Sequence, residues 1–246
     1  MSWVDGTELA STLRKGCFQQ GIRMNKKLLA AMVIGTAGLA WAAPQARADV
    51  ITIGTALNGG TPTVVATGTG TASYSGSLGN FTIAPAGGTG APPLTNPALL
   101  DSDTIDITST ATTDTLDVYV TESDITSPTG LESFLSSFTE NTMTAGWTVT
   151  ESVYLDTADG IFALTTLLGT TTITAGLTTD EQTIAADVGD GPYSITAMYV
   201  INTNDTPGQD NSTINVAVPE PGSLLVLGTG LFAFGMVGWT RRRRGV

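Results

Sequence analysis

The sequence contains no histidine, and its only cysteine, Cys17, precedes a segment that we interpret as a cleavable leader. Lysine and arginine are also absent between Asp49 and Thr240. This part of the chain therefore has no histidine-dependent triad, thiolate, Schiff-base lysine or guanidinium clamp. Carboxylate chemistry remains, as in glycosidases, but Trp147 is the only tryptophan between Asp49 and Val218 and no acid has aromatic-rich surroundings. We therefore expect that the protein is not an enzyme.

The missing cations leave a strongly acidic middle segment. Of the 22 acidic residues, only Asp5, Glu8 and Glu220 lie outside residues 49–218, so this segment has a formal charge of −19, against −12 for the whole chain. Because no lysine or arginine is available for pairing, we expect its carboxylates to be exposed and solvated. A surface of this sign repels polyanions, which excludes nucleic acid as a partner.

The N-terminal part of the chain has the three features of a secretory signal peptide. A basic start at residues 24–27 is followed by an apolar stretch, and Ala46 and Ala48 form a small-x-small cleavage site before Asp49. We therefore predict a signal peptide at residues 24–48, recognised by the secretion translocon and signal peptidase. Residues 1–23 do not fit this pattern. We interpret them as an upstream extension that results from a wrongly assigned start codon. The alternative is that they are a genuine, unusually long N-terminal region of the signal peptide.

A second apolar segment, Gly222–Thr240, lies near the C-terminus and carries no charge. As a helix it would extend about 28 Å, close to the hydrocarbon thickness of a bilayer. Arginine clusters remain on the cytoplasmic side of a membrane. We therefore predict one transmembrane helix at residues 222–240, with the acidic segment on the far side. The arginines that follow it are Arg241, Arg242, Arg243 and Arg244.

A short motif directly precedes this segment and consists of Val218, Pro219, Glu220 and Pro221. The order of Pro-Glu-Pro, apolar span and arginine cluster in residues 219–246 resembles the PEP-CTERM sorting signal of Gram-negative bacteria. The resemblance implies recognition by exosortase, a membrane-embedded enzyme, and cleavage near the motif. The precursor would lie in the inner membrane, and the acidic domain would reach the cell surface, outer envelope or extracellular matrix. An ordinary tail anchor behind a proline-rich linker is the alternative.

Residues 49–218 have the composition of a β protein, rich in Thr, Val, Ile, Gly and Ser. Apolar and polar residues alternate in several segments, including Thr104–Thr108 and Thr115–Val120. Such period-two segments between glycine, proline and aspartate clusters are typical of antiparallel strands. We predict an all-β ectodomain, an antiparallel β-sandwich of about eight to ten strands, with its more regular half in Asp101–Val218.

One segment departs from this alternation, because its apolar residues follow a helical spacing of i, i+3, i+4 and i+7. This spacing predicts one short helix after Pro128. The residues concerned are Leu131, Phe134, Leu135 and Phe138.

Three acidic segments contain carboxylates of the kind that calcium prefers as ligands. The main candidates are Asp101, Asp103 and Asp106 in the first segment and Asp187 and Asp190 in the second, and Asp205 and Asp210 form the third. None of the segments has the spacing of an EF-hand, and aspartate is also common in turns. Diffuse binding of divalent cations is therefore the simpler expectation, and calcium is the one cofactor for which the sequence offers candidates.

Three functions are compatible with these observations. The first is a structural or interaction protein of the cell surface, since PEP-CTERM proteins often accompany exopolysaccharide and biofilm genes. The second is a carbohydrate-binding module, although exposed aromatic candidates are few. The third is a calcium-dependent adhesin, because a −19 domain is repelled by an acidic polysaccharide unless divalent ions bridge the two. We favour the first, with exopolysaccharide as a candidate partner.

Overall fold

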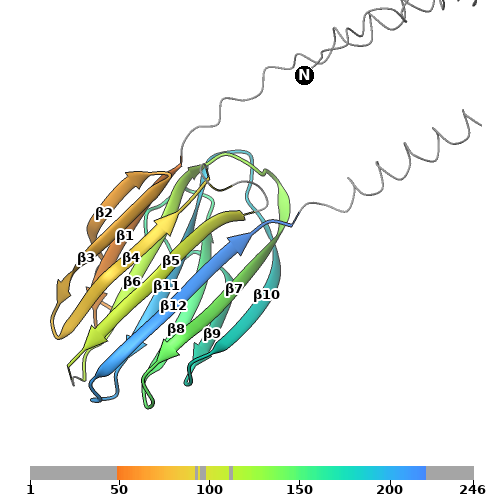
Figure 1. The fold of residues 1–246 in the computed structure, drawn as a ribbon. Coiled ribbons are helices and arrows are strands. Elements are labelled where there is room, and N and C mark those ends of the chain that lie inside the picture. Colours follow the sequence, from red (N-terminus) through yellow and green to blue (C-terminus); the bar gives the residue numbers. More distant parts are fainter. Residues whose placement is uncertain (1–48, 92–93, 95–97, 111–112, 220–246) are drawn as a thin grey trace, which may run out of the picture. The chain divides into compact units, whose positions relative to one another are not determined.

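The computed structural model describes residues 49–219, except 92–93, 95–97 and 111–112 (Figure 1). Within these residues the chain forms twelve strands and no helix. The predicted signal peptide, transmembrane segment and arginine cluster lie outside the described residues. In the described ranges, no helix is long and apolar enough to cross a membrane.

The strands form two six-stranded sheets in which all neighbours are antiparallel. The first sheet contains, in spatial order, β2 (Thr63–Thr69), β1 (Val50–Leu57), β6 (Thr115–Ile125), β11 (Tyr193–Asn202), β8 (Thr148–Asp156) and β9 (Thr166–Ile173). The second contains β10 (Thr178–Asp187), β7 (Leu131–Met143), β12 (Gly208–Ala217), β5 (Ala98–Ser109), β4 (Phe81–Thr89) and β3 (Thr71–Leu78).

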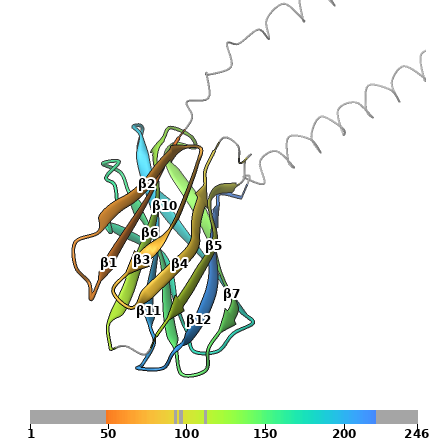
Figure 2. The same ribbon diagram turned by 60° about the vertical axis from the view of Figure 1, so that its left-hand side comes forward.

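The last eight strands have the order of a jelly roll. β5, β12, β7 and β10 are neighbours in one sheet, and β6, β11, β8 and β9 are neighbours in the other. The first four strands extend this arrangement on one side, with β1 and β2 beside β6, and β3 and β4 beside β5 (Figures 1 and 2). The prediction of an antiparallel all-β domain is confirmed, but the strands number twelve rather than eight to ten.

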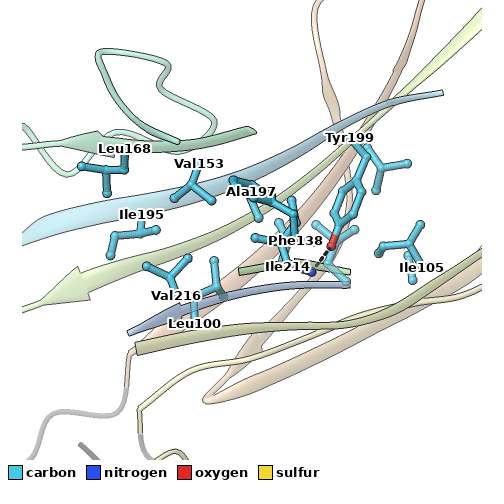
Figure 3. Close-up of a cluster of buried hydrophobic side chains, with 14 of the residues drawn as sticks. Leu100, Ile105, Phe138, Val153, Leu168, Ile195, Ala197, Tyr199, Ile214 and Val216 are labelled. Carbon is cyan, nitrogen blue, oxygen red and sulfur yellow. Dashed lines mark hydrogen bonds between the residues drawn. The ribbon is translucent and has the colours of Figure 1, made fainter. Parts of the chain in front are cut away.

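The core lies between the two sheets and is built from alternate residues of the strands. Ile195, Ala197 and Tyr199 of β11 are fully buried and face Ile214 and neighbouring residues of the second sheet (Figure 3). The Tyr199 hydroxyl accepts a hydrogen bond from the Ile214 amide at 2.9 Å and is also bonded to the Ser102 hydroxyl. Burial of each such large side chain stabilises the fold by about 1.5–3 kcal/mol.

The predicted helix around Phe134 is wrong, because Leu131–Met143 forms the strand β7. Phe134, Ser136 and Phe138 are buried as alternate residues of a strand, whereas Leu131 is 74% exposed. Residues four apart share a face in both helices and strands, so the two phenylalanines fit either structure. The segment forms a strand because its backbone pairs with β10 on one side and with β12 on the other.

A loop after β8 covers part of the outer face of the first sheet. The Phe162 ring lies 5.5 Å from the Tyr119 ring, measured between centroids, and its amide donates to the Thr121 hydroxyl at 3.2 Å. A Cβ atom at Gly54 would be 2.4 Å from a carbon of the Phe162 ring. Glycine at position 54 therefore permits the loop to pack directly on β1.

Candidate functional site

The two predicted processing sites flank the described strands. Val218 is buried directly after β12, and the following residue, Pro219, is exposed. Glu220 and Pro221 lie outside the described residues, as do the four arginines and the cleavage-site residues Ala46 and Ala48. Asp49 is described and buried, and its amide donates to the Ala91 carbonyl at 3.3 Å.

The main candidate calcium ligands belong to two separate parts of the second sheet. Asp101, Asp103 and Asp106 lie on β5, which is separated from β10 and Asp187 by two strands of the same sheet. Asp106 accepts a hydrogen bond from the Asn211 amide, and Asp187 accepts one from the Gly189 amide at 2.9 Å.

Asp190 is exposed, and the side chain of Asp103 lies outside the described part. No group of three or more acidic, cysteine or histidine side chains that could hold a metal ion occurs among the residues described. The calcium site stays a prediction.

The expectation that the carboxylates are exposed is wrong for a large subset of them. The buried acids, each at most 7% exposed, are Asp49, Asp117, Glu122, Glu140, Glu151, Asp156 and Asp210. The expectation assumed that burial requires a cationic partner. The structure instead satisfies several of these groups with backbone amides and hydroxyls: Asp117 accepts from the Gly59 amide at 2.7 Å, and Asp156 from the Thr165 hydroxyl at 2.8 Å.

Three of these acids form a core carboxyl cluster, which we define as Glu140 on β7, Glu151 on β8 and Asp210 on β12. Each lies on the inward face of its strand. The Ser212 hydroxyl is 2.8 Å from a carboxyl oxygen of Glu140 and 2.9 Å from one of Asp210. A hydroxyl has one proton to donate, so at least one of the two carboxyl groups must be protonated for both contacts to be hydrogen bonds.

Burial and mutual repulsion raise the pKa values of all three acids in the core carboxyl cluster. Burial raises the pKa of Glu151 to about 8, with a further rise from the nearby charge of Glu140. Burial also raises the pKa values of Asp210 and Glu140. Neither carboxyl oxygen of Glu151 has a hydrogen-bond partner within the described ranges. These surroundings therefore favour the protonated, neutral form of Glu151.

A second buried acid lies near the start of β1. One oxygen of Glu122 accepts a hydrogen bond from the Ala91 amide at 2.9 Å, and the side chain of Asp49 is close by. Burial raises the pKa of Glu122, and the neighbouring Asp49 raises it further, while the Ala91 hydrogen bond opposes the rise. Tyr193 on β11 is also fully buried, and burial raises its pKa.

The first four strands form a surface of different character, which we call the uncharged flank. Residues 50–100 contain no acidic and no basic side chain. All acids of the domain except Asp49 therefore belong to the sequence from Asp101 onward, which supplies the jelly roll. Because β2 and β3 are the edge strands on this side, the domain has one neutral edge beside a strongly acidic body (Figures 1 and 2).

Two cavities lie along the uncharged flank. The first, of about 350 Å³, opens between the edges of the two sheets and is lined by Thr55, Leu57, Thr63, Val65, Tyr74 and Leu78, among others. The second, of about 490 Å³, lies over β3 and β4 and is lined by residues such as Ser73, Pro85 and Thr89. The lining of the first cavity combines hydroxyl groups with apolar side chains, which suits a neutral ligand carrying both kinds of group.

Comparison with known proteins assigns no family. No family model matches the chain, and no curated protein matches it. The enzymatically active domain of bacteriophage CBA120 tailspike protein 4 shows 14% identity and a TM-score of 0.31, with 56% of this chain and 19% of that chain covered. The structure of infectious bursal disease virus strain Gx shows 14% identity and a TM-score of 0.21, with 69% of this chain and 51% of that chain covered. Neither similarity is strong enough to support a functional argument.

Proposed function

We propose that this protein is an exported, exosortase-sorted protein of the cell surface or extracellular matrix. It is a structural or interaction protein rather than an enzyme, and it acts in association with exopolysaccharide or biofilm. The observation that carries the proposal is the Pro-Glu-Pro motif at the end of the folded domain, followed by an apolar segment and four arginines. The predicted signal peptide at the other end supports export.

The layout of the domain is compatible with processing at both ends. Asp49, before β1, bonds to Ala91 in the β4–β5 connection, and Ala217 at the end of β12 pairs with Ala98 at the start of β5. Both ends of the domain thus lie beside the same connection. Pro219 is exposed, so a membrane enzyme would reach the motif without unfolding the domain.

The uncharged flank is the surface that we assign to interaction. An acidic body of this charge repels other copies and acidic polymers, and this repulsion is weakest at an edge that has no charge. The flank also favours a second candidate function, a carbohydrate-binding module for neutral polysaccharide. Its first cavity offers Tyr74 together with threonine hydroxyls, and aromatic and hydroxyl groups are the usual contacts for sugar rings.

Sorting is tested by expressing the full chain in a Gram-negative host that contains exosortase. The wild-type chain is expected in the surface or medium fraction without its C-terminal segment, and a Glu220→Ala variant is expected to remain at full length in the membrane. Glu181→Ala, an exposed acid on β10, is the matched control and should be sorted normally. Equal release of the wild type and the Glu220→Ala variant would refute exosortase sorting.

The molecular role is tested by retention on the organism's exopolysaccharide, with and without calcium. Retention without calcium that is lost in Tyr74→Ala but kept in Tyr154→Ala supports the carbohydrate-binding module, because Tyr154 lies on β8, outside the flank. Retention only with calcium supports the adhesin. Absence of retention under both conditions supports a structural role.

A further inference from the structure

The backbone of Asp49 is held at a defined place beside a buried carboxyl group. Its amide donates to the Ala91 carbonyl at 3.3 Å, and its carbonyl accepts from the Gly70 amide at 2.7 Å. The Ala91 amide in turn donates to a carboxyl oxygen of Glu122 at 2.9 Å. The nitrogen of Asp49 and the carboxyl group of Glu122 are therefore both bonded to one residue, Ala91.

The surroundings of Glu122 contain no cation. Glu122 is fully buried, and its side chain is hydrogen-bonded to the Ala91 amide and to the Asp49 carboxyl. The titratable groups that face it are the Asp49 carboxyl and the Tyr193 phenol of β11, and Glu132 of β7 acts on the same phenol. All of these are acids, and residues 49–240 contain no lysine or arginine.

We propose that removal of the signal peptide supplies the missing cation, as the α-ammonium group of Asp49. This inference rests on the cleavage before Asp49 that the proposed function includes. Hydrolysis of the Ala48–Asp49 peptide bond consumes one water molecule and leaves a carboxylate on Ala48 and an amine on Asp49. The amine takes up a proton at neutral pH, since an α-amino group has a pKa of about 8.

The new ammonium group lies where the peptide nitrogen of the precursor lay, beside Ala91 and the Glu122 carboxyl. One of its three N–H groups can keep the hydrogen bond to the Ala91 carbonyl, and we assign the others to the carboxyl groups of Glu122 and Asp49. An opposite charge within about 4–6 Å favours the ionised form of both partners. The mature domain therefore holds Glu122 as an ion pair, whereas the precursor has to bury it as a neutral acid.

Cleavage thus stabilises the folded domain, and the precursor is the less stable form. The pKa of the α-amine is raised in the folded state, so its stabilisation is complete below the unfolded value of about 8. The stabilisation is lost as the pH rises through the folded pKa. Processing at the membrane would thereby favour the folded state after translocation rather than before it.

The chain from Asp49 to Val246 contains no lysine, so its α-amine is the only primary amine and can be acetylated selectively. We would prepare this chain in detergent from a fusion cut directly before Asp49, which makes the test independent of export. Acetylation is expected to lower the folded-to-unfolded ratio at pH 7 about tenfold or more, measured by urea unfolding. At pH 10, where most of the amine is neutral, the effect should be smaller.

Glu122→Gln is the decisive variant, because it keeps the shape of the side chain and removes the charge. Acetylation should leave its unfolding midpoint unchanged, while Glu181→Gln should respond like the wild type. The pH dependence of the acetylation rate gives a second readout that holds even where Glu122→Gln is unstable: the wild-type amine should have a pKa above about 8. An ordinary amine pKa, or equal effects of acetylation in wild type and Glu122→Gln, would overturn the ion pair while leaving the sorting proposal intact.

Discussion

Replacement of Glu151 by glutamine should stabilise the domain at alkaline pH and leave it nearly unchanged in acid. Glu151 lies on the inward face of β8, fully buried, and neither of its carboxyl oxygens has a partner among the described residues. Burial raises its pKa from 4.5 to about 8. The folded chain therefore keeps a proton on Glu151 over a pH range in which the unfolded chain has lost it.

The sign and size of the effect follow from proton linkage. Because the folded pKa is raised, the stabilisation is complete below pH 4.5 and is lost as the pH rises through about 8. Over this window the wild type loses up to about 5 kcal/mol of unfolding free energy through this one group. That is a large share of the roughly 5–15 kcal/mol by which a domain is stable. Glutamine does not titrate, so the variant avoids this loss.

The assay is urea unfolding at pH values from 4 to 9, followed by the fluorescence of the buried Trp147. The Glu151→Gln variant and the wild type should agree within about 1 kcal/mol at pH 4 and differ by several kcal/mol, in favour of the variant, at pH 8.5. Glu181→Gln, which removes an exposed charge, should show a small and nearly constant difference. A difference between Glu151→Gln and wild type that does not change with pH would refute the buried neutral carboxyl.

Three further predictions concern the core and the charge layout. Tyr199→Phe should cost about 1–3 kcal/mol in urea unfolding, because it leaves the buried Ile214 amide without its acceptor. Gly88→Ala should cost a similar amount, since its Cβ would lie 2.5 Å from a methyl carbon of Val120, whereas Gly191→Ala meets nothing within 4 Å and should be neutral. Trypsin should produce no internal peptide from the acidic domain even in urea, as mass spectrometry would show, because the domain has no lysine or arginine.

The strands were predictable where alternation was strong and flanked by turn residues. Thr115–Val120 lies within β6 and Thr104–Thr108 within β5, and in both segments apolar and polar residues alternate between the two faces of the strand. The strands before Asp101 were harder to predict from the sequence. Its glycine- and threonine-rich segments form β2, β3 and β4 by pairing with strands next to them in the sequence, although these segments lack the clear alternation of apolar and polar residues that marks a strand.

The core carboxyl cluster had a visible signal in the sequence. Glu151 occupies the same parity as Val149, Val153 and Leu155, which places it on the buried face of any strand through this segment. An acid at such a position interrupts the apolar pattern, because an unpaired buried carboxylate is costly. The other two acids of the cluster, Glu140 and Asp210, lie on β7 and β12, and only the jelly-roll topology brings these strands near β8.

The uncharged flank also had a visible signal in the sequence, because it is a long stretch of residues without charge. Its meaning depends on the topology, since β1 and β2 join one sheet and β3 and β4 join the other. Only this division makes the neutral residues into one continuous edge with a cavity between the sheets.

The most direct test of the account is the identity of the two ends of the protein as it occurs at the cell surface. Intact mass and N-terminal sequencing of the surface fraction should give a chain that begins at Asp49 and lacks the apolar segment and the arginines after Pro221. A cytosolic chain of full length, with both terminal segments still attached, would contradict export, sorting and the ion pair that processing creates.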